Sequence, residues 1–277
     1  MCWRIVRIEG DGSLKLTLAG EVSEGATDCN GVTSKSALIN NGASVTYGYK
    51  EITGLDGNTW YIADYENDGK TATNTTGNTS TSLKEALDAW FESKFKSDGE
   101  LTAAGNKIKE DEWCLGGKYE YKYHINTRVL LDALGLQTMY DENGLYNWNY
   151  TTINRGLGDL ICDETKDSVT SRVGSMTADE VFLAGGGLGG PAPLNYLDEN
   201  ASYNYPYWTL SVGSFIGNED RAFVVDLSMS NGLYDGFGQV SGSLSSYSVR
   251  PSVTLVTNTQ ITKGTGTKGD PYIINVG

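Results

Sequence analysis

The stretch from residue 207 to residue 255 constrains the fold most, because it holds three apolar runs of strand length. They read YWTLSVGSF, RAFVVDLS and VRPSVTLV, and Gly-, Ser- and Asn-rich segments separate them. The second run places Phe223, Val225 and Leu227 on one face, and the third run repeats the pattern with Val249, Pro251, Val253 and Leu255. Period-two alternation rich in β-branched residues predicts half-buried antiparallel strands.

Two aromatic-bearing segments adjoin these runs, and we expect them to lie near each other at the ends of the C-terminal strands. Residues 195–207 and 230–247 are rich in Gly, Ser, Asn and Tyr, which predicts loops. Aromatic side chains are costly to expose without a use, so these loops are candidate binding surfaces. The alternative is that Tyr234 and Phe237 fold back and cover the sheet. The candidate ligand-binding residues are Asn195, Tyr203, Tyr205, Tyr234, Asp235, Phe237, Gln239 and Tyr247.

The N-terminal half predicts a hairpin and helices. Residues 2–8 alternate in character, residues 9–13 read EGDGS, and residues 14–18 return as LKLTL, which predicts a β-hairpin. A capping box at residues 82–85 opens a predicted helix over residues 83–95. Its apolar stripe predicts a core face, with a partner-binding face as the alternative; the stripe is Leu83, Leu87, Trp90, Phe91 and Phe95.

Further elements follow from shorter patterns. We expect a second main helix over residues 126–134, and a short helix that opens at a capping box over residues 177–180. Residues 45–49, 60–63 and 169–173 predict short strands. Residues 260–276 predict a turn and one last strand outside the core sheet. We therefore expect a main domain over residues 1–256 and a C-terminal extension over residues 257–277.

Three stretches carry a family resemblance: CWRIVRIEGDGSLKL near the N-terminus, MTADEVFLAGG at residues 176–186, and WTLS followed by SVRPSVTL. Together they resemble the C-type-lectin-like domain shared by formylglycine-generating enzymes, the variable proteins of diversity-generating retroelements and many surface proteins of gut bacteria. The resemblance implies an α+β fold with antiparallel sheets, two main helices and long loops. It also implies paired terminal strands and a C-terminal half whose loops bind ligands.

The same resemblance implies an extracellular or cell-surface binding module of bacterial or phage origin. In retroelement-diversified proteins, the varied, ligand-contacting residues fall in the matching C-terminal segment, which carries over to the eight candidates as a prediction. The expected function is an adhesin or receptor-binding module for an extracellular protein or glycan. Two alternatives stay open: a structural domain of a pilus or phage fibre, and a degenerate formylglycine-generating-type enzyme.

Catalysis is not expected. Formylglycine-generating enzymes bind copper through two cysteines in the C-terminal half, whereas this chain has no cysteine after Cys162. A catalytic triad needs a base, and His124 is the single histidine. The GGGLGG run at residues 185–190 lacks the lysine of a phosphate loop and predicts a flexible loop. The adjacent carboxylates at residues 141–142 and 163–164 predict solvated loops.

No cofactor is expected, although calcium stays open. The Glu-Pro-Asn, Gln-Pro-Asp and Trp-Asn-Asp motifs of calcium-dependent sugar-binding lectins are missing from the sequence. Three oxygen-rich loops could hold calcium by oxygen ligation: residues 141–143, 198–200 and 218–220.

The net charge of the chain limits which partners it can bind. A net charge of −14 argues against nucleic acid and anionic membrane surfaces, which both need a basic patch. No transmembrane segment is predicted, so we expect no membrane insertion within this chain.

The four cysteines allow three pairings. Sequence order favours Cys2–Cys29 and Cys114–Cys162, and the similar cysteine positions of the gut surface proteins support that choice; the alternative is four free buried thiols in a cytosolic protein.

Overall fold

The structure, a computed structural model, describes residues 1–32, 34–39, 45–46, 48–53, 59–64, 81–117, 166–177, 180–181, 184, 187–188, 207–216, 219–226, 232–236, 248–267 and 269–274. The predicted second helix at residues 126–134, His124 and the carboxylate pairs at 141–142 and 163–164 lie outside these ranges.

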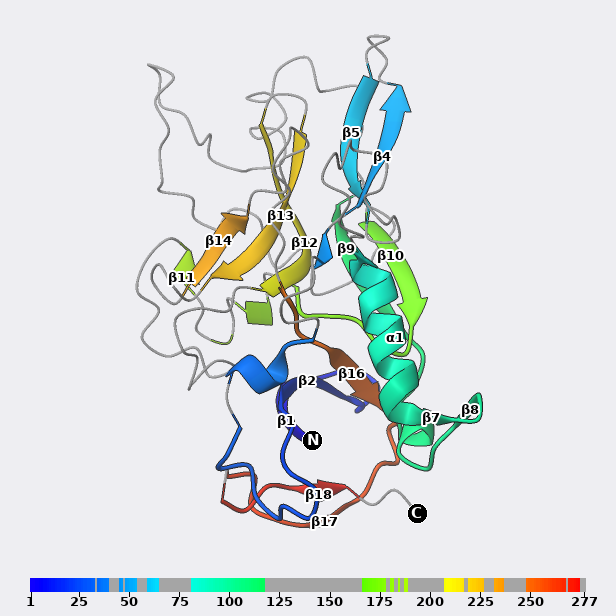
Figure 1. Ribbon diagram of the computed structural model, residues 1–277, viewed down its shortest axis with the longest axis vertical. Helices are drawn as coiled ribbons and strands as arrows, with labels where there is room; N and C mark the ends of the chain where they lie inside the picture. The colour runs from blue at the N-terminus through cyan, green and yellow to red at the C-terminus, as the bar shows by residue number, and fades with distance from the viewer. Residues whose placement is uncertain are drawn as a thin grey trace.

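The N-terminal hairpin forms as predicted and joins a strand from the far end of the chain. Strand β1 (Cys2–Ile8) pairs antiparallel with β2 (Leu14–Gly20), and β2 pairs antiparallel with β16 (Ser252–Leu255), giving the order β1-β2-β16 (Figure 1). Two register irregularities interrupt the β1–β2 ladder, between Cys2 and Trp3 and between Ile5 and Arg7. Bulges of this kind bend a strand and re-aim its side chains.

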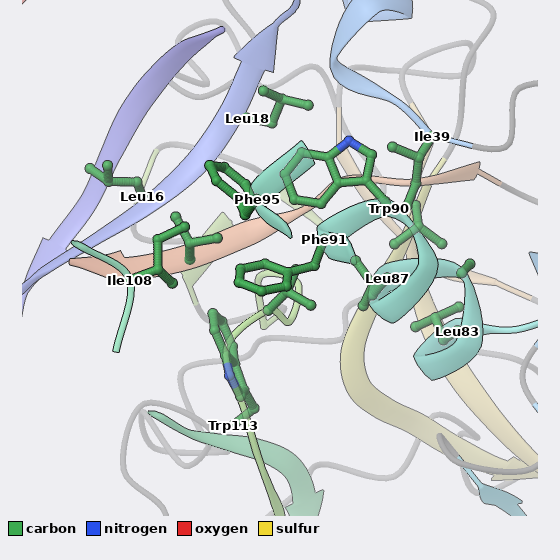
Figure 2. Packing of buried hydrophobic residues seen from close by; sticks show 14 of the residues in the cluster. Leu16, Leu18, Ile39, Leu83, Leu87, Trp90, Phe91, Phe95, Ile108 and Trp113 are labelled. Atoms are coloured by element: carbon green, nitrogen blue, oxygen red, sulfur yellow. The ribbon is translucent and has the colours of Figure 1, made fainter. Parts of the chain in front are cut away.

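The predicted helix over residues 83–95 is confirmed as α1 (Leu83–Phe95), and its apolar stripe lies in the core. Figure 2 shows this stripe packed against the N-terminal sheet and against Trp113. Trp90 makes edge-on ring contacts with Trp3 and Phe95, at centroid distances of 6.1 and 5.7 Å. Leu83 and Leu87 are fully buried, so the stripe is a core face and not a partner-binding face.

A seven-stranded sheet forms the second main layer of strands. Its main path runs β11-β14-β13-β12-β15, while β5 pairs with β13 and with β4. The bounds are β4 Gly48–Thr53, β5 Thr59–Asp64, β11 Gly187–Leu188, β12 Tyr207–Ile216, β13 Glu219–Asp226, β14 Gly232–Gly236 and β15 Ser248–Val249. The β12–β13 and β13–β14 pairs are antiparallel, whereas β11–β14 and β12–β15 are parallel.

Short elements complete the described part of the chain. Further strands form separate two-stranded pairs. These are β3 (Val45–Thr46) with β6 (Thr81–Ser82), β7 (Lys96–Ser97) with β8 (Glu100–Leu101), β9 (Asp111–Gly117) with β10 (Lys166–Ser171), and β17 (Ile261–Lys263) with β18 (Ile273–Ile274). Two short 3₁₀ helices are η1 (Ser34–Ala37) and η2 (Gly105–Lys107).

The run VRPSVTLV is not one half-buried strand, as the alternation predicts, but two strands in two sheets. It breaks at Arg250 and Pro251, so that β15 pairs with β12 and β16 pairs with β2. Both faces of β16 are buried, because Ser252 and Thr254 are as inaccessible as Val253. The prediction fails because an alternating pattern shows which side chains are apolar, but it does not show that another layer of the protein also buries the polar ones.

The prediction of a loop over residues 230–247 is wrong for five of its residues. Residues 232–236 form β14, in which Tyr234 pairs with Val224 and Asp235 with Phe223. In the same way, two residues of the predicted glycine loop form β11 against the start of β14. These segments are extended because their backbones pair with a neighbouring strand. A Gly-rich sequence has no alternating pattern from which such a strand could be predicted.

The C-terminal extension contains two strands instead of the single one predicted. Strands β17 and β18 form their own hairpin outside both main sheets, and Figure 1 shows it at the end of the molecule remote from β4 and β5. Gly264 and Gly266 both adopt positive φ in the connecting turn. A side chain at Gly264 would collide with the Pro271 backbone, so the turn requires glycine there.

Candidate binding surface

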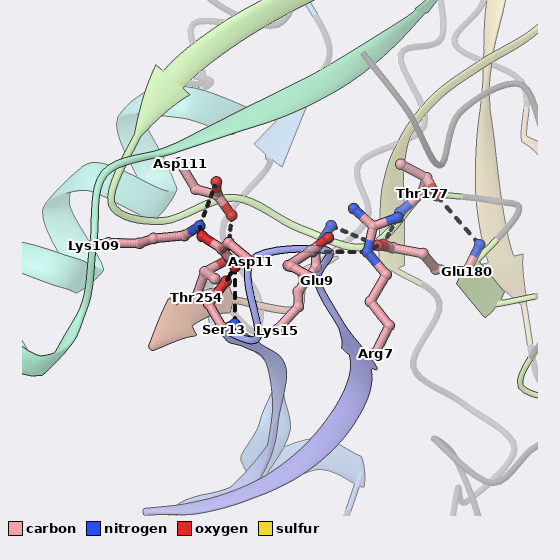
Figure 3. A network of polar contacts seen from close by, with 10 residues as sticks. All are labelled: Arg7, Glu9, Asp11, Ser13, Lys15, Lys109, Asp111, Thr177, Glu180 and Thr254. Carbon is pink, nitrogen blue, oxygen red and sulfur yellow. Dashed lines mark hydrogen bonds and ion pairs between the residues drawn. The ribbon is translucent and has the colours of Figure 1, made fainter. Parts of the chain in front are cut away.

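A buried ion pair joins the N-terminal hairpin to the segment between β10 and β11. The Lys15 ammonium lies 2.6 Å from Oε1 of Glu180, and both side chains are almost fully buried (Figure 3). The Arg7 guanidinium is 3.4 Å from the same oxygen. This oxygen is held by ionic contact instead of a well-directed hydrogen bond. Lys15 also lies 4.5 Å from the Trp113 ring centroid, a cation–π contact.

The second Glu180 oxygen completes the predicted capping box at residues 177–180. The Thr177 backbone N–H donates to Oε2 of Glu180 at 2.9 Å, and the Glu180 N–H donates to the Thr177 hydroxyl at 3.2 Å. The N–H groups of Val181 and Ala184 then donate to the carbonyls four residues earlier, which is a helical pattern. Glu180 therefore has two roles: Oε2 caps the start of a helix, and Oε1 neutralises the charge of Lys15.

Arg250 provides a second buried link. Its Nε donates to the Leu18 carbonyl at 2.8 Å, and its guanidinium lies 5.6 Å from the Tyr207 ring centroid. The Ser175 hydroxyl lies within hydrogen-bond distance of the Arg250 and Trp208 carbonyls, at 3.0 and 3.3 Å. One arginine thus connects β2, the start of β12 and the break between β15 and β16.

A more exposed polar network fastens the turn of the N-terminal hairpin to β9 and β16. Hydrogen bonds from the Ser13 hydroxyl and N–H, and then from Lys109, hold the pKa of Asp11 well below its usual range. Burial acts to lower the pKa of Lys109, but Asp11 and Asp111 together raise it above its usual value. The Thr254 hydroxyl donates to Asp111 at 2.6 Å.

The three stretches that carry the family resemblance meet in this buried junction, which we define as Lys15, Ser175, Glu180, Tyr207 and Arg250 with their contacts. Lys15 comes from the first stretch, Glu180 from the second and Arg250 from the third. Each of these charges is buried and is held by an ion pair or by a hydrogen bond. Sequence reasoning missed these partners, although a lysine within LKLTL and an arginine within SVRPSV are charged residues inside apolar strands, which is a usable signal.

The first residues of β12 fix the seven-stranded sheet to this junction. Tyr207, Trp208 and Leu210 are essentially inaccessible to solvent. The Leu210 N–H donates to the Met176 carbonyl at 2.9 Å. The root of β12 is therefore rigid, and the pairing of β13 and β14 extends the sheet from it.

The two candidate segments are flanked by strands that are neighbours in the sheet. Residues 189–206 leave from β11 and residues 237–247 leave from β14, and these two strands run parallel to each other. The two segments return at Tyr207 and Ser248, which are paired across the parallel β12–β15 ladder. The strands that flank the two segments are thus neighbours in the sheet. The segments themselves lie outside the described residues, so their proximity stays a prediction.

Of the eight predicted ligand-binding residues, the structure places two, on adjacent positions of β14. These are Tyr234 and Asp235. The other six lie outside the described residues: Asn195, Tyr203, Tyr205, Phe237, Gln239 and Tyr247. We define the candidate binding surface as β14 together with segments 189–206 and 237–247.

The cysteine prediction is confirmed for its first pair. Cys2 and Cys29 form a disulfide with a Cα–Cα distance of 5.9 Å, which ties the start of β1 to the segment after β2. Cys114 is disulfide-bonded as well. Its predicted partner, Cys162, lies outside the described residues, so the second pairing stays a prediction.

Among the described residues, His, Cys, Asp and Glu side chains form no cluster able to hold a metal ion. The calcium candidates at 141–143 and 198–200 lie outside these residues. At 218–220, Glu219 and Asp220 are the first residues of β13 and not part of a loop. Across the described chain, no helix combines the length and apolarity that crossing a membrane requires.

Comparison of the chain with protein-family models, with curated proteins and with solved structures finds no match in any of the three.

Proposed function

We propose that this chain is an extracellular binding module of the C-type-lectin-like type, which recognises a protein or glycan through the candidate binding surface. The observation that carries the proposal is the pairing of Tyr207 with Ser248, because it fixes the returns of a Tyr-rich segment, 189–206, and a Ser-rich segment, 237–247, at one place in the sheet. Recognition needs no chemistry in this scheme, only side chains held at fixed positions.

Three further features support the proposal. Strand β2 pairs with β16, so segments near the two ends of the chain share a sheet, as the resemblance implies. A disulfide closes the N-terminal segment, which suits an oxidising compartment. Tyr, Ser, Gly and Asn dominate the two segments, and surfaces of this composition combine rigid contact area with adaptable hydrogen bonds.

The test is a glycan array and a panel of extracellular proteins, probed with the wild-type chain and with a variant carrying Tyr203→Ser, Tyr205→Ser and Phe237→Ser. A ligand that binds the wild type should lose at least about tenfold in affinity for the variant, the equivalent of about 1.4 kcal/mol. The matched control is Tyr272→Ser, which removes an exposed tyrosine from the C-terminal hairpin.

Three results would contradict the proposal. Equal binding of the ligand by the wild type and the triple variant would show that the loops are not the site. Loss of binding in the Tyr272→Ser control alone would move the site to the C-terminal hairpin. Concentration-dependent assembly that the triple variant abolishes would favour a pilus or fibre subunit instead.

A further inference from the structure

A cavity of about 600 Å³ lies between the N-terminal sheet and the C-terminal hairpin. The β1–β2 hairpin provides one wall, the segment closed by the Cys2–Cys29 disulfide a second, and residues 271–274 with Ile261 a third. Small-molecule sites in proteins have volumes of roughly 300–1,000 Å³, so this cavity is of ligand size.

The rim of the cavity gathers the exposed apolar side chains. Five large hydrophobic side chains are exposed in the described part of the chain, and four of them line this one cavity: Met1, Ile261, Tyr272 and Ile273, each 44–47% accessible. The fifth, Ile8, does not line it. Chance would scatter exposed apolar residues singly over a surface, whereas clustering around a hollow marks a binding site.

The lining also indicates which kind of ligand fits. Trp3, Ile5 and Leu14 extend the core into the cavity as partly buried apolar side chains. The two charged lining side chains, Arg4 and Asp28, have opposite signs, so the side chains of the walls carry no net charge. A wall of this composition favours a neutral, mainly apolar ligand over an anion or a cation.

The walls are braced in place. The disulfide holds the second wall against β1. In the third wall, the N–H groups of Thr265 and Gly266 both donate to the Asp270 carbonyl, at 3.0 Å each. A Cβ at Gly266 would come 2.6 Å from the Tyr272 ring, so the glycine lets that ring pack closely against the turn. We propose that this cavity is a preformed binding site for a neutral, largely apolar small molecule.

The test uses N-phenyl-1-naphthylamine, a neutral dye that becomes fluorescent in apolar sites, with the full oxidised chain. We expect saturable binding at one dye per chain. Ile273→Asp places a carboxylate on the rim and should weaken dye binding by at least about tenfold. Ile8→Asp is the matched control, since it changes an exposed isoleucine that is outside the cavity, and it should bind the dye as the wild type does.

A second rim variant, Ile261→Asp, repeats the test in case Ile273→Asp disturbs the hairpin, and near-ultraviolet circular dichroism checks the fold of each. The idea fails if no saturable binding occurs, if both rim variants bind like the control, or if the anionic dye 8-anilino-1-naphthalenesulfonate binds as tightly. It also fails if the rim instead drives dimerisation that both rim variants abolish. The triple variant of the loops should keep dye binding, which separates this site from the proposed function.

Discussion

The buried junction and the candidate binding surface differ in the residues from which they are built. The junction uses charged side chains inside apolar strands, each paired or hydrogen-bonded, as with Lys15, Glu180 and Arg250. The candidate binding surface uses Gly, Ser, Asn and Tyr on segments that return to the sheet beside that junction, at Tyr207 and Ser248. The difference teaches that buried charges connect distant parts of this chain, whereas the residues proposed to bind a ligand carry no charge network in the described part of the structure.

The largest expected effect comes from breaking the ion pair in the junction. Glu180→Ala leaves Lys15 buried without its partner and removes a helix cap, so we expect a loss of about 3–5 kcal/mol in the free energy of unfolding. Guanidinium unfolding followed by tryptophan fluorescence measures it. The control is Lys94→Ala, which breaks an exposed pair with Glu21 and should cost about 1 kcal/mol or less. Equal losses in the two variants would show that the junction is not special.

Removal of the Cys2–Cys29 disulfide should have the next largest effect. The bridge joins residues 27 apart in sequence, so the double change Cys2→Ser and Cys29→Ser should cost about 3–4 kcal/mol by loop entropy. Guanidinium unfolding of the variant and of the oxidised wild type makes the comparison. Intact mass with and without reductant confirms the oxidation state of the wild type. An unchanged unfolding midpoint would mean that this bridge does not brace the N-terminal sheet.

A single methyl group tests how tightly the junction is packed. In Gly174→Ala, the new Cβ would come 2.3 Å from the ring of Trp113, which is fully buried, so we expect a loss of about 1–3 kcal/mol. Gly10→Ala is the matched control, because a Cβ there meets no atom within 4 Å. Thermal unfolding of both variants decides the matter. Similar stability would show that Trp113 has room to move.

The exposed network at Asp11 should give a smaller, pH-dependent effect. Because folding lowers the pKa of Asp11 below its ordinary value of 3.8, its contribution is complete above about pH 5 and is lost as the pH falls through the folded pKa. In Asp11→Asn, the melting temperature should therefore fall less steeply between about pH 5 and pH 2 than in the wild type. If melting temperature depended on pH in the same way in both proteins, Asp11 would not contribute to stability in acid.

The smallest effect on stability is expected in the candidate binding surface. Replacing Tyr203, Tyr205 and Phe237 by Ser should change the free energy of unfolding by no more than about 0.5 kcal/mol, because side chains that only contact a ligand support no core. Thermal unfolding measures this alongside ligand binding. A loss as large as that of Gly174→Ala would show that these aromatics cover the sheet.

The comparison also shows how far the sequence could lead. The first hairpin, helix α1, the capping box at Thr177 and the first disulfide follow from patterns within about 30 residues, and the structure contains all four. Strand β14 did not follow, since GLYDG carries no alternation and extends only because β13 offers its edge. The cavity could not be predicted from the sequence either, because its walls come from the two ends of the chain.

By itself, then, the sequence determined the local elements and placed aromatic residues in segments suited to binding. Only the tertiary structure decided that Lys15 would meet Glu180, that Arg250 would reach the Leu18 carbonyl, and that VRPSVTLV would divide between two sheets. Backbone propensity and periodicity act over a few residues. Burial of a charge depends on partners more than 150 residues away, which no local pattern can specify.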